Sequence, residues 1–127
     1  GDEWTWLNSS NGIPWNFTAN CNPCEENWQG LTCKFNPQHS SHIVDISLSN
    51  HNLNGSLPTA LINFTELERF TVDYNNIIGT IPACLGNLSS LIELQLSYNK
   101  LTGTIPATLG QLQNLEFLWL VHIPELV

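Results

Sequence analysis

The sequence repeats itself with a period of 24 residues between about residue 43 and residue 120. Glycine, proline and leucine mark the period at Gly55, Gly79 and Gly103, at Pro58, Pro82 and Pro106, and at Leu61, Leu85 and Leu109. A fixed period of this length is typical of stacked supersecondary units, each of which buries its apolar side chains against the copies beside it. The repeat therefore predicts a solenoid, a fold that displays an extended surface and seldom carries chemistry of its own.

Apolar pairs two positions apart predict one short strand in each unit. The pairs are Ile46 and Leu48, Phe70 and Val72, Leu94 and Leu96, and Leu118 and Leu120. Side chains two residues apart leave the same face of a β-strand, so these pairs should point into the core. The glycine column suits a backbone bend that a side chain would hinder. The proline column fits an irregular or helical return path rather than a strand.

Asparagine recurs once per unit at a position that can join neighbouring turns. Asn75 and Asn99 share this column, and an inward amide there can hydrogen-bond the backbone of adjacent turns. His51 and Ile123 take the same position in the first and last units, so we expect the ladder to be incomplete at both ends.

These motifs are similar to those of a known family. Residues 94–106, LQLSYNKLTGTIP, resemble the plant-type leucine-rich repeat LxLxxNxLxGxIP, and the resemblance extends over about residues 43–120. Upstream, Cys24, Trp28, Gly30 and Cys33 resemble the N-terminal cap of the same family, C…WxGxxC. The resemblance implies an α/β repeat fold: a right-handed curved solenoid with a concave parallel β-sheet. It also implies a cap stapled by a Cys24–Cys33 disulfide, and recognition of protein or glycan without catalysis.

We expect two regions on this basis. Residues 1–42 form the N-terminal cap, and residues 43–127 form the leucine-rich repeats, as three 24-residue units and a partial fourth. The chain has 127 residues, enough for one domain.

The acidic composition limits the kinds of molecule that the chain can bind. The formal net charge is −8, and Lys34, Arg69 and Lys100 are the positively charged residues. Nucleic acids and anionic membranes are therefore excluded as expected partners, because both require basic patches. The sequence contains no apolar run of the ~18–20 residues that a membrane-spanning helix needs, so we expect no membrane span.

Five N-x-S/T sequons indicate a eukaryotic secretory route and N-linked glycans. They lie at Asn8, Asn16, Asn54, Asn63 and Asn87. Asn63 and Asn87 are one period apart, so their glycans would stand on the same flank. We therefore expect a secreted, extracellular glycoprotein.

Two cysteines remain outside the predicted staple. Cys84 lies in a small-residue column and is expected to be a free, partly buried thiol, while Cys21 could pair with Cys84, stay free or bridge to another chain. A zinc site formed by Cys21, Cys24 and Cys33 with His39 or His42 is an alternative, disfavoured by the secretory sequons. We expect no metal and no cofactor.

The sequence contains no recognisable catalytic group. Its four histidines belong to no metal motif or triad. Asp45 and Glu93 fall on the outward strand face with Arg69 between them, about 10 Å apart at ~4.8 Å per strand. A charge ladder explains this arrangement better than a catalytic dyad, so we expect a protein that is not an enzyme.

The outward strand positions form a polar grid that is the predicted ligand-binding surface on the concave face. Two tyrosines stand in register on it, which suits recognition of a peptide or a sugar. The predicted binding residues are Asp45, Ser47, Arg69, Thr71, Asp73, Tyr74, Glu93, Gln95 and Tyr98. A solvated sheet without a ligand is the alternative.

The fourth unit departs from the polar pattern. Phe117, Trp119 and Val121 are apolar at outward positions, and we predict that they contact another molecule. Either the chain is part of a longer solenoid, or other copies of it cover this end. Extracellular recognition is thus the first expectation, and a structural subunit that self-assembles into a fibre or coat is the second. Ice binding, which some members of the resembled family show, is a distant third that rests on the column Ser56, Thr80 and Thr104.

Overall fold

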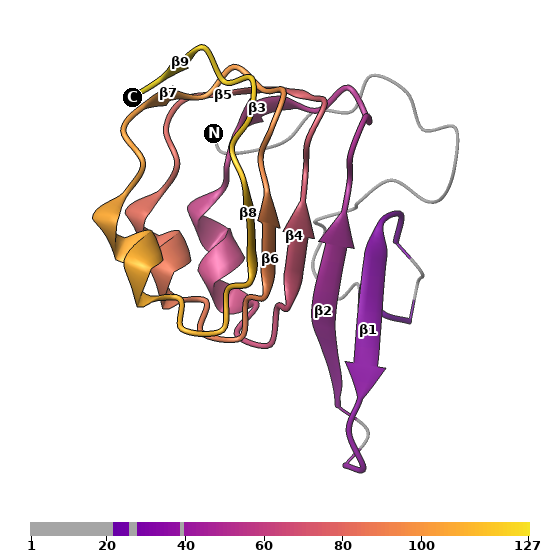
Figure 1. Cartoon of the computed structure of the whole chain (residues 1–127). Helices are drawn as coiled ribbons and strands as arrows, with labels where there is room; N and C mark the ends of the chain where they lie inside the picture. Colours follow the sequence, from indigo (N-terminus) through magenta and orange to yellow (C-terminus); the bar gives the residue numbers. More distant parts are fainter. Residues whose placement is uncertain (1–21, 26–27, 39) are drawn as a thin grey trace.

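The protein folds into stacked turns, each about one sequence period long. The structure, a computed structural model, describes residues 22–25, 28–38 and 40–127 (Figure 1). The strands are β1 (Leu31–Phe35), β2 (Ser41–Ser47), β3 (Asn54–Ser56), β4 (Arg69–Thr71), β5 (Asn76–Ile78), β6 (Glu93–Gln95), β7 (Thr102–Gly103), β8 (Phe117–Trp119) and β9 (Glu125–Leu126). The helical elements are η1 (Thr59–Asn63), η2 (Ala83–Asn87) and η3 (Ala107–Gln111). Figure 1 shows these helices on the side of the turns opposite β4, β6 and β8.

One five-stranded sheet runs along the stack in the order β1-β2-β4-β6-β8. The last four strands are parallel, and Asp45 pairs with Arg69, Arg69 with Glu93, and Glu93 with Phe117. Each pairing joins residues one sequence period apart, which confirms the predicted parallel sheet. Two smaller parallel sheets, β3-β5 and β7-β9, form a second side of the turns.

The apolar columns form a single core along the stack. Ile46, Phe70 and Leu94, which occupy equivalent places in successive strands, are fully buried. Burying such a side chain contributes about 1.5–3 kcal/mol relative to leaving it exposed. Leu118 takes the same place in β8 but is 43% exposed, because no further turn among the described residues packs against it.

The prolines start short 3-10 helices rather than α-helices. Pro58, Pro82 and Pro106 precede η1, η2 and η3 with φ of −73°, −65° and −62°, close to the value that the proline ring imposes. Each helix has five residues and turns one buried leucine toward the core. The predicted helical return path is therefore confirmed, and its described helices are of the tighter 3-10 type.

Asn75 and Asn99 join neighbouring turns as predicted. The Asn75 amide donates to the carbonyls of Leu48 and Val72, both at 2.8 Å, and its oxygen accepts from the backbone N–H of Leu53 at 3.0 Å. Asn99 repeats the pattern one turn later and bonds the Val72 carbonyl at 2.9 Å. Both side chains are at least nine-tenths buried, so these bonds satisfy backbone groups that water does not reach.

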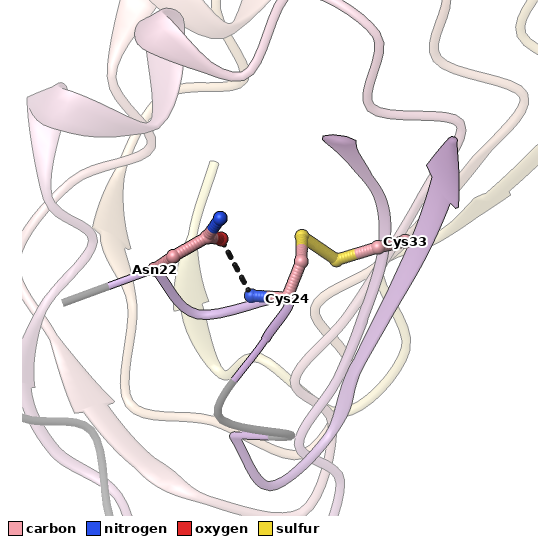
Figure 2. The surroundings of a disulfide bond; sticks show 3 residues. All are labelled: Asn22, Cys24 and Cys33. Carbon is pink, nitrogen blue, oxygen red and sulfur yellow. Dashed lines mark hydrogen bonds between the residues drawn. A yellow bond between two sulfur atoms is a disulfide. The ribbon is translucent and has the colours of Figure 1, made fainter. Parts of the chain in front are cut away.

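The N-terminal cap closes the first end of the core. A disulfide joins Cys24 to Cys33, with 5.8 Å between their Cα atoms, and the Asn22 side chain accepts from the Cys24 N–H (Figure 2). Trp28 is buried beside it. The β1 strand pairs antiparallel with β2, so the cap and the first repeat share one sheet and residue 42 lies within β2.

Candidate functional site

The outward side of the β2-β4-β6-β8 sheet carries the predicted binding residues, and we call it the sheet face. The short strands keep their register, so side chains of one column stand side by side across the strands. Ser47, Thr71, Gln95 and Trp119 form such a column, and the Thr71 hydroxyl donates to that of Ser47 at 3.3 Å. The sheet face is therefore a continuous surface built by four separate turns.

Charged side chains lie in the column at the amino ends of these strands. Arg69 Nε is 3.2 Å from Asp45 Oδ2, and the Ser47 hydroxyl donates to the same carboxylate at 2.7 Å. Glu93 lies beyond Arg69 and accepts from the Gln95 amide. The predicted charge ladder thus contains one ion pair, and because Arg69 is exposed the pair contributes little to stability.

Three aromatic rings are stacked where the strands end. Tyr74 and Tyr98 lie with ring centroids 4.2 Å apart and planes 10° apart, and Tyr98 and His122 follow at 4.6 Å and 25°. All three have left-handed backbones, with φ between 52° and 55°. A side chain strains this conformation, yet here it places successive rings over one another. We call these three residues the aromatic stack.

A shallow hollow lies between the aromatic stack and the last strand of the sheet. Tyr98 and Trp119 line it together with Ser97, whose hydroxyl accepts from the Val121 N–H at 2.9 Å. At one end lies the half-buried carboxylate of Asp73, which accepts from the Ser49 hydroxyl. The residues that line the hollow are Asp73, Tyr74, Gln95, Ser97, Tyr98, Trp119 and Val121.

The aromatic stack alters the acidity of one of its members. The pKa of Tyr74 is raised above 10.0, first by a hydrogen bond with the Tyr98 side chain, then by desolvation and by the negative charges of Tyr98 and Asp73. The neutral phenol of Tyr74 is therefore favoured at the rim of the hollow over a wide range of pH.

The hollow joins residues that the sequence assigned to two separate surfaces. Asp73, Tyr74, Gln95 and Tyr98 were predicted to bind ligand, whereas Trp119 and Val121 were predicted to be assembly contacts, and all six line it. On the same face but outside the hollow, Asp45, Arg69 and Glu93 form the charged column, and Ser47 and Thr71 belong to the column of Gln95 and Trp119 on the earlier strands. Phe117, 50% exposed, lies in that charged column outside the hollow.

The sequence-based choice of binding residues left out Ser97 and His122. Both belong to columns that the period identifies, since Ser97 is one period after Asp73 and His122 is one period after Tyr98. The register alone could therefore have added them. The left-handed backbone that stacks the rings has no such signal at Tyr74 and Tyr98, because tyrosine does not favour that conformation.

The predicted glycosylation sites and the remaining cysteines differ in exposure, and some lie outside the described residues. Asn63 and Asn87 are exposed at the ends of η1 and η2, while Asn54 is half-buried in β3 and its amide donates to the Asn52 carbonyl. Cys84 is a free, half-buried cysteine. Asn8, Asn16 and Cys21 lie outside the described residues. In the part of the chain that the structure describes, no helix is long and apolar enough to span a membrane.

Comparison with known proteins places this architecture in one family. A family model for the leucine-rich repeat matches residues 65–122. A probable leucine-rich repeat receptor-like protein kinase of Arabidopsis thaliana is 34% identical over 74 residues, which cover 58% of this chain and 7% of the kinase. These matches and the Cys24–Cys33 disulfide confirm the predicted resemblance to plant-type leucine-rich-repeat proteins with a cysteine-bearing N-terminal cap.

Several solved structures with this fold are ectodomains of plant receptors. The BIR3–SERK2 complex from Arabidopsis thaliana contains a chain with a TM-score of 0.72 and 27% identity, matched over 84% of this chain and 56% of that one. The ectodomain of the Arabidopsis thaliana receptor kinase GASSHO1/SCHENGEN3, in complex with CASPARIAN STRIP INTEGRITY FACTOR 2, has a TM-score of 0.60 and 31% identity, over 81% and 15% of the two chains. The present chain thus spans about half or less of these proteins.

Proposed function

We propose that this chain is a non-catalytic extracellular recognition domain that binds a peptide or protein partner on its sheet face. The observation that carries the proposal is the hollow, where exposed aromatic rings lie beside polar side chains. Tyr98 is 39% exposed and Trp119 is 50% exposed. Aromatic side chains with one polar end dominate binding surfaces, because they bury a large area at little cost in conformational entropy. The similarity to receptor ectodomains, two of them solved in complexes, supports the same function.

Selection of peptide ligands followed by substitution tests this function. Peptides selected from a random display library against the full chain should bind about tenfold more weakly to a Tyr98→Ala, Trp119→Ala variant. Phe35→Ala is the matched control, because it removes another exposed aromatic ring from the far end of the sheet. Equal losses in both variants, or no loss in either, would refute a binding site on the sheet face.

We propose further that the chain is secreted and carries N-linked glycans on Asn63 and Asn87. Both asparagines are exposed, and neither is on the sheet face, since they end the helices on the opposite side of the turns. Glycans there would leave the hollow open. After expression in eukaryotic secretory cells, glycosidase treatment should lower the mass, and Asn63→Gln and Asn87→Gln should each remove one glycan. A chain with no mass change in that system would exclude this proposal.

A second candidate function is self-assembly through the last turn. Phe117, Leu118 and Val121 are each between 43% and 50% exposed, and the side chain of Leu118 belongs to a column that is buried elsewhere. A phenylalanine or tryptophan side chain buries about 150–250 Å² when covered, so a second copy of the chain stacked here would remove a large apolar area from water.

Sedimentation distinguishes self-assembly from a monomeric domain. The unmodified chain should form dimers or larger species at micromolar concentration, and a Phe117→Ser, Trp119→Asp variant should be monomeric. Phe35→Ser is the control for a loss of exposed apolar surface elsewhere. If the unmodified chain is monomeric, assembly through this surface is ruled out. The apolar surface would then be covered by a following repeat of a longer polypeptide or by another partner.

A further inference from the structure

We propose that the hollow on the sheet face binds a cationic side chain, an arginine or lysine presented by an extended peptide. Its charged head group would pair with Asp73, and its aliphatic stem would lie against Val121 and Trp119. This inference rests on the proposed recognition function and names the chemistry of the partner.

The carboxylate of Asp73 forms no ion pair among residues 22–25, 28–38 and 40–127. The ion pairs of the described residues join Lys34 to Glu68 and Arg69 to Asp45. The third positive residue, Lys100, pairs with no carboxylate in the described part of the chain. Asp73 accepts a hydrogen bond from Ser49 but remains half-buried and uncompensated beside the aromatic rings. A half-buried carboxylate interacts more strongly with an added cation than a fully solvated one, because the surrounding dielectric is lower.

The open ring of Trp119 provides a surface for the stem of a basic side chain. Trp119 takes no part in the aromatic stack, so its half-exposed ring is open to a ligand. The long aliphatic stems of arginine and lysine pack on apolar surface while their charged head groups reach beyond it. The faces of Tyr98, in contrast, are covered by Tyr74 and His122.

The spacing between Asp73 and Trp119 and the net charge of the chain also favour a long cationic side chain. The turn that holds Asp73 follows β4, and Trp119 ends β8, so two strand spacings of about 4.8 Å separate them. A ligand that touches both must therefore reach about 10 Å across Ser97 and Gln95, which suits the long stems of arginine and lysine. The net charge of −8 also repels anionic ligands and attracts cationic ones.

Titration with N-acetyl-arginine amide tests the inference on the full chain. We expect saturable NMR shifts at the Trp119 indole and the Asp73 and Val121 amides, with affinity that falls as salt is added. N-acetyl-citrulline amide, which has nearly the same shape without the charge, should bind about fivefold more weakly or not at all. Equal binding of the two probes, or shifts confined to other surfaces, would overturn the proposal.

Substitution of the carboxylate provides a second readout. Asp73→Asn removes the charge but keeps an oxygen that can accept from the Ser49 hydroxyl, and it should weaken arginine binding about fivefold. Glu125→Gln makes the same charge change on exposed β9 and should leave binding unaltered. If Asp73→Asn fails to fold, the comparison of arginine with citrulline on the unmodified chain still decides.

The same reagents separate this inference from the proposed function. Selected peptides that need Trp119 and Tyr98 but tolerate both Asp73→Asn and the loss of their basic residues would refute the cation site and leave recognition on the sheet face intact. Selected peptides that bind without Trp119 and Tyr98 would instead refute recognition on this face.

Discussion

At the scale of single residues, the Asn75 side chain hydrogen-bonds backbone groups of two successive turns. It accepts from the N–H groups of His51 and Leu53 in the turn before it, and it donates to carbonyls in both turns. Each buried backbone group that loses such a partner costs about 1–3 kcal/mol. One amide therefore holds two turns in a fixed relation.

Asn75→Ala should lower the free energy of unfolding by about 2–5 kcal/mol, because it leaves several buried donors and acceptors without partners. The adjacent Asn76 is the control: it lies half-buried in β5, and Asn76→Ala should cost less than about 1 kcal/mol. Urea denaturation of both variants measures the difference. Similar losses for the two substitutions would contradict a bridging role for Asn75.

Alkaline titration should reveal the raised pKa of Tyr74. The folded-state pKa lies above the unfolded value of 10.0, so the folded chain holds the proton more tightly. The stability from this group is then present in full below pH 10.0 and is lost as the pH rises through the folded pKa. The chain has two tyrosines, so in a Tyr98→Phe variant the tyrosinate absorbance reports Tyr74 alone.

Tyr98→Phe is the matched variant for this titration, since it keeps a stacked ring and removes the hydroxyl. It should lower the pKa of Tyr74 toward 10.0, because the hydrogen bond with Tyr98 is the largest cause of the increase. An unchanged Tyr74 titration in Tyr98→Phe would mean that the hydroxyl of Tyr98 does not act on it.

At the scale of elements, η2 and η3 approach each other closely at Gly86. Gly86 lies in η2, next to the backbone of η3. A Cβ added there would lie 2.3 Å from the Thr108 carbonyl oxygen. Gly110 has the equivalent place in η3, and an added Cβ there would meet no atom within 4 Å. The same residue type in the same column thus has two different packing environments.

Gly86→Ala should destabilise the protein by about 1–3 kcal/mol, because the backbone of η3 must move to admit the methyl group. Gly110→Ala should be neutral or slightly stabilising, since alanine restricts the unfolded chain and meets no neighbour. Thermal unfolding of the pair measures the contrast. Equal melting temperatures for the two variants would show that η2 and η3 are not packed this closely.

The elements also show how far a sequence of this kind predicts its structure. The period located the parallel strands, the Asn75 bonds and the buried column of Ile46, Phe70 and Leu94, because each follows from one residue type repeated at one spacing. The hollow did not follow in the same way. Its shape depends on Trp119, where the column changes from polar to aromatic, and on the left-handed backbone at Tyr98, which no local sequence preference indicates.

At the scale of the whole molecule, the cap and the repeats share one sheet. The β1 strand extends the main sheet, and the disulfide restrains a loop whose ends are nine residues apart in sequence. The cap therefore adds a paired strand beside the first turn, and Trp28 within the cap is buried.

A Cys24→Ser, Cys33→Ser variant should lose about 2–3 kcal/mol of stability, the amount expected for a loop of this length. The loss should appear in the unfolding of the whole chain, because the first turn would lose its cover. Cys84→Ser is the control, as that cysteine forms no disulfide. If the double variant unfolds with the same midpoint as the control, the cap does not contribute to the stability of the repeats.

Each strand pairs with the strand one period away, so the architecture can be extended by whole repeat units. Since the sheet register and the asparagine bonds join only consecutive turns, duplication of one complete unit, such as residues 68–91, would leave every existing contact type in place. A deletion of a few residues would instead shift all the columns at once. Such a duplication would add one tyrosine to the aromatic stack and lengthen the sheet face by one strand spacing of about 4.8 Å, while the cap keeps its pairing with the first turn.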